Sequence, residues 1–438
     1  MRETTAGASA RRPTPFPPEA VAQALAPLKL PGFRYLAGAY TVNELGNWVG
    51  EIALAVLVFD ETGSPLATAA LFIGMHFLPA FLSQGVVART EPTGTKVMLP
   101  ALYLGEAVTF VALALTVSSF ALALVVALAI VDGTLAIAAR AFTRASAVAV
   151  LSPSGQLRQG NALINVGFTG AGALGPALGG LVVAGLGVQA ALFVDAASFV
   201  AVAALLAIAR SLPQVKSEPQ QSGSRLRAGL AYVRDHPALG RLLAMQAVAF
   251  VFFTTVIPIE IVYAKDTLGV GDSGYGALLS AWGIGMVFGS LVFTAIGHRA
   301  SLKPLLFFST LAIGVSYLGM AAAGNLLVAC LAGSVGGGGN GIQWVSVMSA
   351  VQELTMSEYQ ARVVGLLEAI GKAMPGVGFL LGGVIAQLLS PRASFLTAGL
   401  GVVVILALSV PLLRGGRWGT AHEAGLDEVP ETANVTSI

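Results

Sequence analysis

The feature that most constrains this chain is a series of long apolar stretches separated by short polar segments. A helix needs about 20 apolar residues to cross the roughly 30 Å of hydrocarbon in a bilayer. Stretches of that length occur at 34–59, 65–88, 97–117, 119–146, 160–184, 188–210, 241–264, 273–297, 302–323, 325–352, 361–389 and 393–413. The sequence therefore predicts an all-α membrane protein with twelve transmembrane helices.

Composition supports this class and argues against several others. Charged residues make up 11% of the 438 residues, whereas a soluble domain typically carries about a quarter. A net charge of +2 gives no basis for nucleic acid as a partner. The single cysteine, Cys330, and four scattered histidines predict neither a disulfide framework nor a metal site or cofactor. Walker, His-Glu-x-x-His and Gly-x-Ser-x-Gly motifs are absent from the sequence, so we expect no enzyme.

One long polar segment divides the twelve stretches into two sets of six. We expect a disordered cytoplasmic tail over 1–32, a six-helix bundle over 33–210, a cytoplasmic linker over 211–240, a second bundle over 241–413 and a cytoplasmic tail over 414–438. Lys and Arg are enriched in cytoplasmic loops. Only Lys265 and Arg392 fall in the loops that would be outside, so both termini are predicted to be cytoplasmic. The second half of the linker fits either an amphipathic helix at the membrane surface or a solvated connection.

An internal repeat relates the two sets. When the chain is shifted by 203 positions, Gly175 falls on Gly378 and Gly179-Gly180 falls on Gly382-Gly383. Residues 146–148 likewise match 349–351. Two halves related by an axis along the membrane normal produce such a pattern, with the substrate site between them near the midplane.

Three stretches resemble the major facilitator superfamily, in particular the bacterial drug and metabolite efflux branch that includes macrolide and siderophore exporters. They are 33–64, with Leu45-Gly46-Asn47-Trp48 at its centre, 140–180, and 352–365. The resemblance implies a multi-pass protein of the bacterial inner (cytoplasmic) membrane. Its expected partners are a small-molecule substrate, protons and the lipid bilayer, and we expect a monomer.

A glycine-proline run in the fifth stretch resembles the antiporter motif of that superfamily. It comprises Gly172, Gly175, Pro176, Gly179 and Gly180. Small residues allow close helix contact, and proline removes a backbone donor and bends a helix. The alternative interpretation is close packing without any meaning for transport direction.

The inner-gate loop departs from the family pattern. In the loop after the second stretch, Arg89 stands where the family carries Asp, and Glu91 is a candidate substitute. We assign Arg89, Glu91, Arg140, Arg144 and Arg362 to a possible inner gate. Arginines at inner helix ends also anchor membrane interfaces, which is the simpler interpretation of Arg140 and Arg144.

Carboxylates at membrane depth are expensive and by default suggest function. The resemblance implies that the first, fourth, seventh and tenth helices line the cavity. Glu44 and Glu51 lie in the first and Asp132 in the fourth, so we predict proton coupling by these three. Burial favours the protonated form of a carboxyl group. The alternative is a set of static carboxylates that only fix packing.

The substrate site is predicted opposite these acids. The tenth stretch contains a glycine run followed by Asn340, Gln343 and Trp344, which we expect to face Asn47 and Trp48. Consecutive glycines weaken a helix, and a break at membrane depth is tolerated beside a cavity. Tight glycine packing against a neighbouring helix is the alternative. For Glu368 and Lys372, at i and i+4 of the eleventh stretch, we expect a pair on one helix face.

The function favoured by the sequence is secondary active export of a hydrophobic or amphiphilic small molecule by proton antiport with alternating access. An importer or uniporter on the same fold, and a non-transporting membrane sensor, remain alternatives at this point. The preference for export rests on resemblance alone.

Overall fold

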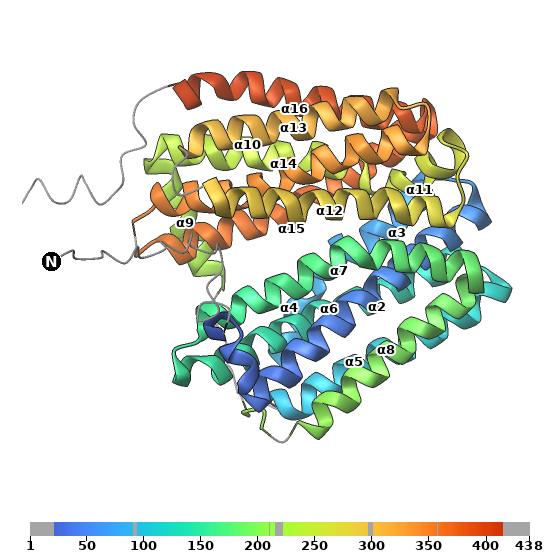
Figure 1. The fold of residues 1–438 in the computed structure, drawn as a ribbon, viewed down its shortest axis with the longest axis vertical. Coiled ribbons are helices and arrows are strands. Elements are labelled where there is room, and N and C mark those ends of the chain that lie inside the picture. Colours follow the sequence, from blue (N-terminus) through green and yellow to red (C-terminus); the bar gives the residue numbers. More distant parts are fainter. Residues whose placement is uncertain are drawn as a thin grey trace, which may run out of the picture.

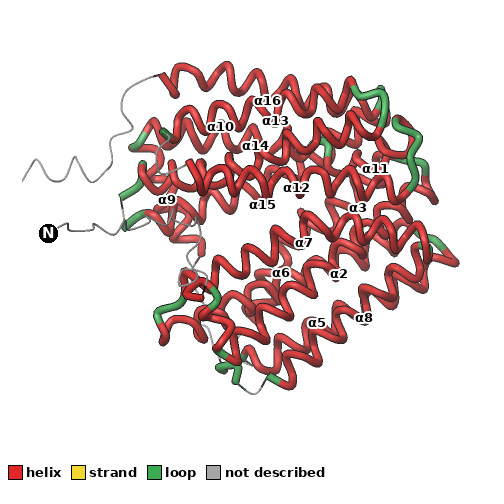
Figure 2. Tube along the Cα trace, viewed as in Figure 1, coloured by secondary structure: helices red, strands yellow, loops and turns green. Residues whose placement is uncertain are grey.

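The structure of the protein is a computed structural model that describes residues 22–90, 94–209, 211–214, 222–296, 301–356 and 358–414. Every regular element in these residues is a helix (Figures 1 and 2). The longer helices are α2 (Pro31–Thr62), α3 (Pro65–Phe72), α4 (Leu78–Thr90), α5 (Thr95–Thr116), α6 (Leu122–Leu151), α7 (Leu157–Leu186), α8 (Val188–Ile208), α9 (Ser222–Asp235), α10 (Pro237–Thr254), α12 (Asp272–Ile296), α13 (Leu302–Ala322), α14 (Leu326–Glu353), α15 (Gln360–Leu388) and α16 (Pro391–Arg414).

Eleven helical segments in the described residues are long and apolar enough to cross a membrane. Two of them contain a π-helical turn. A π-helical turn, Ile73–Phe77, joins α3 to α4, and α10 continues through α11 (Glu260–Val262) into a second π-helical turn, Tyr263–Thr267. The remaining helix, α14, has 28 residues and is less apolar because of its glycines and Asn340. Together these segments correspond to the twelve predicted stretches.

The internal repeat has a direct structural counterpart. Gly175 and Gly179 of α7 lie against Trp48 of α2, the first spanning helix, whereas Gly378 of α15 lies against Thr254 of α10, the first of the second set. Gly175 and Gly378, which are equivalent in the repeat, therefore each allow a close contact within their own half. Figure 1 shows the two sets as separate layers that approach one another along α7 and α12.

The glycine run of α14 does not break the helix. Helix α14 is continuous from Leu326 to Glu353, and its glycines lie against α12 and α13. A Cβ at Gly337 would meet the carbonyl of Trp282, and one at Gly341 would meet the carbonyl of Met286. The close-packing interpretation therefore describes this segment, because small residues on both helices let their backbones approach.

The second half of the linker forms a helix, α9, as one of the two interpretations predicted. Tyr232 anchors it: its ring stacks on Tyr359, with centroids 4.4 Å apart, and its hydroxyl accepts a hydrogen bond of 3.1 Å from the Met356 amide. Val233 is buried, but Leu230 is exposed. Part of α9 therefore packs on the beginning of α15.

The predicted tails lie largely outside the described residues. Of the segment 1–32, the described part contains a helical turn, Ala26–Lys29, before α2 begins at Pro31. At the other end, α16 reaches Arg414.

Candidate functional site: a cavity between the two halves

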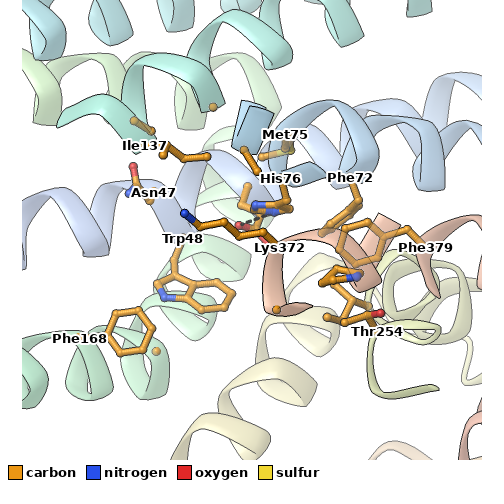
Figure 3. A pocket seen from close by; sticks show the side chains of 18 of the residues that line it. Asn47, Trp48, Phe72, Met75, His76, Ile137, Phe168, Thr254, Lys372 and Phe379 are labelled. Carbon is orange, nitrogen blue, oxygen red and sulfur yellow. Dashed lines mark ion pairs between the residues drawn. The ribbon is translucent and has the colours of Figure 1, made fainter. Parts of the chain in front are cut away.

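A cavity of about 840 Å³ lies between the two sets of helices. Pockets for drug-sized molecules have volumes of about 300–1,000 Å³. Ten aromatic side chains from both halves line it: Trp48, Phe72, Phe110, Phe168, Phe250, Phe253, Tyr275, Trp282, Tyr317 and Phe379. Figure 3 shows several of them around the cavity, with Trp48 and Phe168 on one wall and Phe72 and Phe379 on another. The lining suits an apolar or aromatic molecule.

The halves meet on one side of this cavity. Gly180 of α7 lies against the backbone of Gly276 in α12, and Gly383 of α15 lies against Ala69 of α3. Gly180 and Gly383 are equivalent positions in the repeat, so two equivalent pairs of helices close this side. Orientation by the positive-inside rule makes it the outer side.

The lining extends toward the opposite, expected cytoplasmic ends of the helices. Gln84 and Val87 of α4 and Arg144 of α6 belong to it, and each lies in the last third of its membrane segment. On α7, Gly172 lies against Gly283 of α12, whereas Gly167, farther inward, faces Thr41 of its own half. The cavity is therefore sealed on the outer side and extends toward the inner side.

The glycine-proline run forms the centre of the outer seal. Gly172 contacts Gly283 of α12 through its carbonyl, and the Ala177 amide donates a 2.8 Å hydrogen bond to Ser280 Oγ. Pro176 is buried inside a continuous α7. The predicted set of Gly172, Gly175, Pro176, Gly179 and Gly180 thus lies on one helix that touches both α2 and α12. The helices pack closely at these residues. A role of this run in antiport remains a prediction.

An ion pair also bridges the halves at the outer end. Lys265 Nζ lies 2.6 Å from Asp60 Oδ1 of α2 and 2.8 Å from Asp272 Oδ1 at the start of α12. Only the contact with Asp60 crosses between the halves. Lys265 is 18% exposed, so this pair is only partly screened by solvent.

We expect Asp60→Asn to favour opening of the outer side about two- to fivefold, because a partly exposed ion pair contributes up to about 1 kcal/mol. A Leu279→Cys reporter in a Cys330→Ala background would measure this as faster labelling by an impermeant maleimide from outside. Leu279 lines the cavity. Asp266→Asn is the matched control, since Asp266 is exposed and forms no ion pair among the described residues. Equal labelling of both variants would contradict the prediction.

The three predicted coupling acids lie in or beside the cavity. Glu51 lines it and its Oε2 lies 3.6 Å from His76 Nε2, an ion pair marked by the dashed line beside His76 in Figure 3. Asp132 also lines it, is 9% exposed, and its buried Oδ1 makes no hydrogen bond to the described residues. Glu44 is buried behind the lining, with its Oε1 3.7 Å from Arg140 Nη2. The role of these three acids in proton coupling stays a prediction.

The predicted substrate residues separate into two groups. Asn47, Trp48 and Asn340 line the cavity. Gln343 points elsewhere: it is buried and its amide donates a 3.2 Å hydrogen bond to Thr310 Oγ1 of α13. Trp344 is 48% exposed and packs edge-on against Phe250, outside the lining. The structure therefore does not bring Gln343 and Trp344 to the cavity.

The predicted inner-gate residues do not meet in one network within the described residues. Arg89 is exposed and donates to the Gly85 carbonyl of its own helix, and Arg362 lies over the Tyr359 ring at 5.0 Å. Arg140 and Arg144 instead line the cavity. Glu91 lies outside the described residues.

Several lining residues were missed by the sequence reasoning. His76, Glu260 and Lys372 all line the cavity, and Lys372 forms no ion pair with Glu368 in the described part of the chain. A histidine and a lysine inside apolar stretches were the available signals. The sequence of an apolar segment does not reveal whether such a side chain points into a cavity.

Two further acids are buried in the first half, away from the lining. Glu106 and Asp195 are fully buried, and Glu106 makes no hydrogen bond to the described residues through either oxygen. Asp195 Oδ1 accepts a 3.0 Å hydrogen bond from Ser198. Glu106 and Asp195 lie on α5 and α8 and do not belong to the lining of the cavity.

Comparison with known proteins relates this architecture to a known family of transporters. A family model described as a transmembrane secretion effector of the major facilitator type matches residues 22–427. The chain is 26% identical over 196 residues to the enterobactin exporter EntS of Shigella flexneri, which covers 43% of this chain and 44% of that relative. The chain thus aligns with less than half the length of this curated relative.

Solved transporters share the fold. The nucleoside transporter NupG, as its D323A mutant, superposes with a TM-score of 0.71 at 13% identity, covering 87% of this chain and 98% of that one. A transporter of the POT family in complex with a thioalcohol-conjugated peptide gives 0.68 at 12%, covering 88% and 97%. A bacterial homologue of the human lysosomal transporter Spinster gives 0.66 at 13%, covering 88% and 97%. The predicted all-α membrane fold and the family resemblance are confirmed.

Proposed function

Because the chain belongs to the transmembrane secretion effector family of major facilitator transporters, we propose that it exports a hydrophobic or amphiphilic small molecule by proton antiport. It is a multi-pass membrane transporter rather than an enzyme. Candidate substrates are drugs, antibiotics, siderophores and other metabolites. The bacterial inner membrane is the proposed location, with support from the partial similarity to a bacterial exporter.

The observation that carries this proposal is the cavity between the halves, sealed on the outer side and extended toward the inner side. A substrate enters such a cavity from the cytoplasm. Rocking of the halves about the α7–α12 and α3–α15 contacts would then open the outer side, as alternating access requires. The aromatic lining favours an apolar body, and Asn47 and Asn340 supply polar contacts.

Proton coupling is assigned to the acids of the first half. Asp132 and Glu51 face the cavity, and Glu44 lies beside Arg140, which also lines it. A proton that neutralises Glu44 weakens its attraction to Arg140 and frees the guanidinium for other contacts. In this scheme, proton binding at Glu44 and substrate binding in the cavity are linked through the same cationic side chain, Arg140.

The test is uptake of amphiphilic dyes and antibiotics into inside-out vesicles that contain the protein, with and without a collapsed proton gradient. The proposal expects uptake that requires the gradient. Glu44→Gln is expected to lower that uptake, and exposed Glu353→Gln at the inner end of α14 is a charge-matched control.

Other outcomes separate the alternatives. Uptake that persists without the gradient argues for a uniporter. Accumulation of substrate in intact cells that express the protein, instead of depletion, argues for an importer. If the protein binds compounds but transports none of them, the result favours a non-transporting sensor and contradicts the proposal.

A further inference from the structure

Lys372 of α15 lies inside the cavity and has no ion-pair partner among the described residues. It lies 12 residues from Gln360 and 16 from Leu388, or about 18 Å and 24 Å from the two helix ends at 1.5 Å per residue. It is nonetheless exposed, and it lines the cavity. Its exposure is therefore toward the cavity. Figure 3 shows the side chain extended into this space, with the amino group directed away from Phe379.

No carboxylate of the described residues lies within ion-pair distance of Lys372. Glu51, on the opposite wall, lies next to His76 instead. A lysine at membrane depth is costly, and such residues almost always pair with a charge or mark a ligand pathway. The missing partner of Lys372 is therefore expected to come from a ligand.

The charges of the lining are separated along the membrane normal. Asp132 is 10 residues from the outer end of α6, and Glu260 is seven residues before Thr267, where its own segment ends on the outer side. Arg144 lies seven residues from the inner end of α6, at Leu151. Arg144 also has no ion pair among the described residues. Unpaired cations thus occupy the inner, open part of the cavity, and acids occupy the outer part.

We propose that Lys372 binds the anionic group of the transported molecule, so that the preferred substrates are organic anions with an aromatic or other apolar body. The anionic group meets Arg144 on entry and pairs with Lys372, while the body packs among Trp48, Phe72 and Phe379. The aromatic rings supply apolar contact area, and the lysine selects substrates by their charge. This inference rests on the proposed function, because it specifies the substrate of the same cavity.

The test compares two dyes of one skeleton, 1-anilinonaphthalene-8-sulfonate, an anion, and N-phenyl-1-naphthylamine, its uncharged counterpart. Binding is measured by equilibrium dialysis against the purified full chain in non-ionic detergent without phospholipid, and dye bound to empty micelles is subtracted. The wild type is expected to bind the sulfonate more tightly. Lys372→Gln is expected to weaken sulfonate binding about fivefold and to leave amine binding unchanged.

Two variants control for charge and position. Lys372→Arg keeps the charge and should retain most of the preference. Lys29→Gln removes an exposed lysine outside the cavity and should have no effect. Equal weakening of both dyes by Lys372→Gln would overturn the inference, and so would a wild type without preference for the sulfonate. Lys372 would then contribute to packing or balance the negative charge of Glu51.

The binding measurement uses no proton gradient. If vesicle uptake proves independent of the gradient while the charge preference follows Lys372, the antiport proposal fails and this inference stands. If uptake is gradient-dependent but Lys372→Gln leaves the charge preference intact, the inference fails and the proposed function stands.

Discussion

An Asp132→Asn variant is expected to lose gradient-driven uptake into inside-out vesicles by about tenfold or more, because an intramembrane carboxyl group that carries protons cannot be replaced by an amide. The amide keeps the size and shape of the side chain but cannot ionise. Asp132 lines the cavity, and its buried Oδ1 has no hydrogen-bond partner among the described residues, so no fixed contact accounts for its charge.

Exchange of labelled for unlabelled substrate at equal pH on both sides separates coupling from binding. This exchange requires reorientation of the loaded protein but no net proton transfer, so we expect Asp132→Asn to retain it. Asp235→Asn, at the exposed end of α9, is the matched control and should behave as the wild type. Full gradient-driven uptake by Asp132→Asn would remove this residue from the coupling scheme, and loss of exchange as well would assign it to substrate binding or packing.

The second large effect is expected at the seal between the halves. A Cβ at Gly180 would meet the backbone of Asp272 and Gly276, which cannot rotate away as a flexible side chain can. Gly180→Val should therefore disfavour the outward-closed state by about 1–3 kcal/mol, the usual cost of overpacking. That corresponds to a factor of about 5–150 in the equilibrium between the two states.

Maleimide labelling from outside again reports the opening, with the Leu279→Cys reporter in the Cys330→Ala background. Gly180→Val should increase labelling and reduce transport together. The matched control is Gly185→Val on the same helix, because a Cβ at Gly185 has no atom within 4 Å. Both variants carry the same loss of glycine within α7, so a difference between them reports the seal. Unchanged labelling by Gly180→Val would show that the α7–α12 contact does not hold the outer side closed.

Much of the architecture was predictable because its signals are local or periodic. Span lengths follow from the thickness of the bilayer, and the repeat at 203 residues correctly indicated equivalent helices in the two halves. The glycines of α7 were correctly expected to permit close contact, since absence of a side chain has the same steric consequence in any membrane bundle.

The site was predicted less completely. Asn47, Trp48, Asn340, Glu51 and Asp132 do line the cavity, but Gln343 and Trp344 do not. Arg140 was expected at an interface or gate, and the structure places it in the cavity lining beside Glu44. The errors at Gln343 and Trp344 concern the direction of side chains around helices whose positions were right.

The sequence by itself thus determined the class of protein, the number and order of the helices, the twofold repeat and the small residues at which helices meet. Only the tertiary structure decided which side of each helix faces the cavity, and so placed Lys372 and His76 within it. The physical reason is that lipid and protein interior are both apolar, so a membrane helix lacks the contrast between a buried and a solvated face that reveals orientation in a soluble helix. Orientation is then set by packing between segments far apart in the chain, as in the contact of Gly180 with Gly276 and the 2.8 Å bond from Ala177 to Ser280.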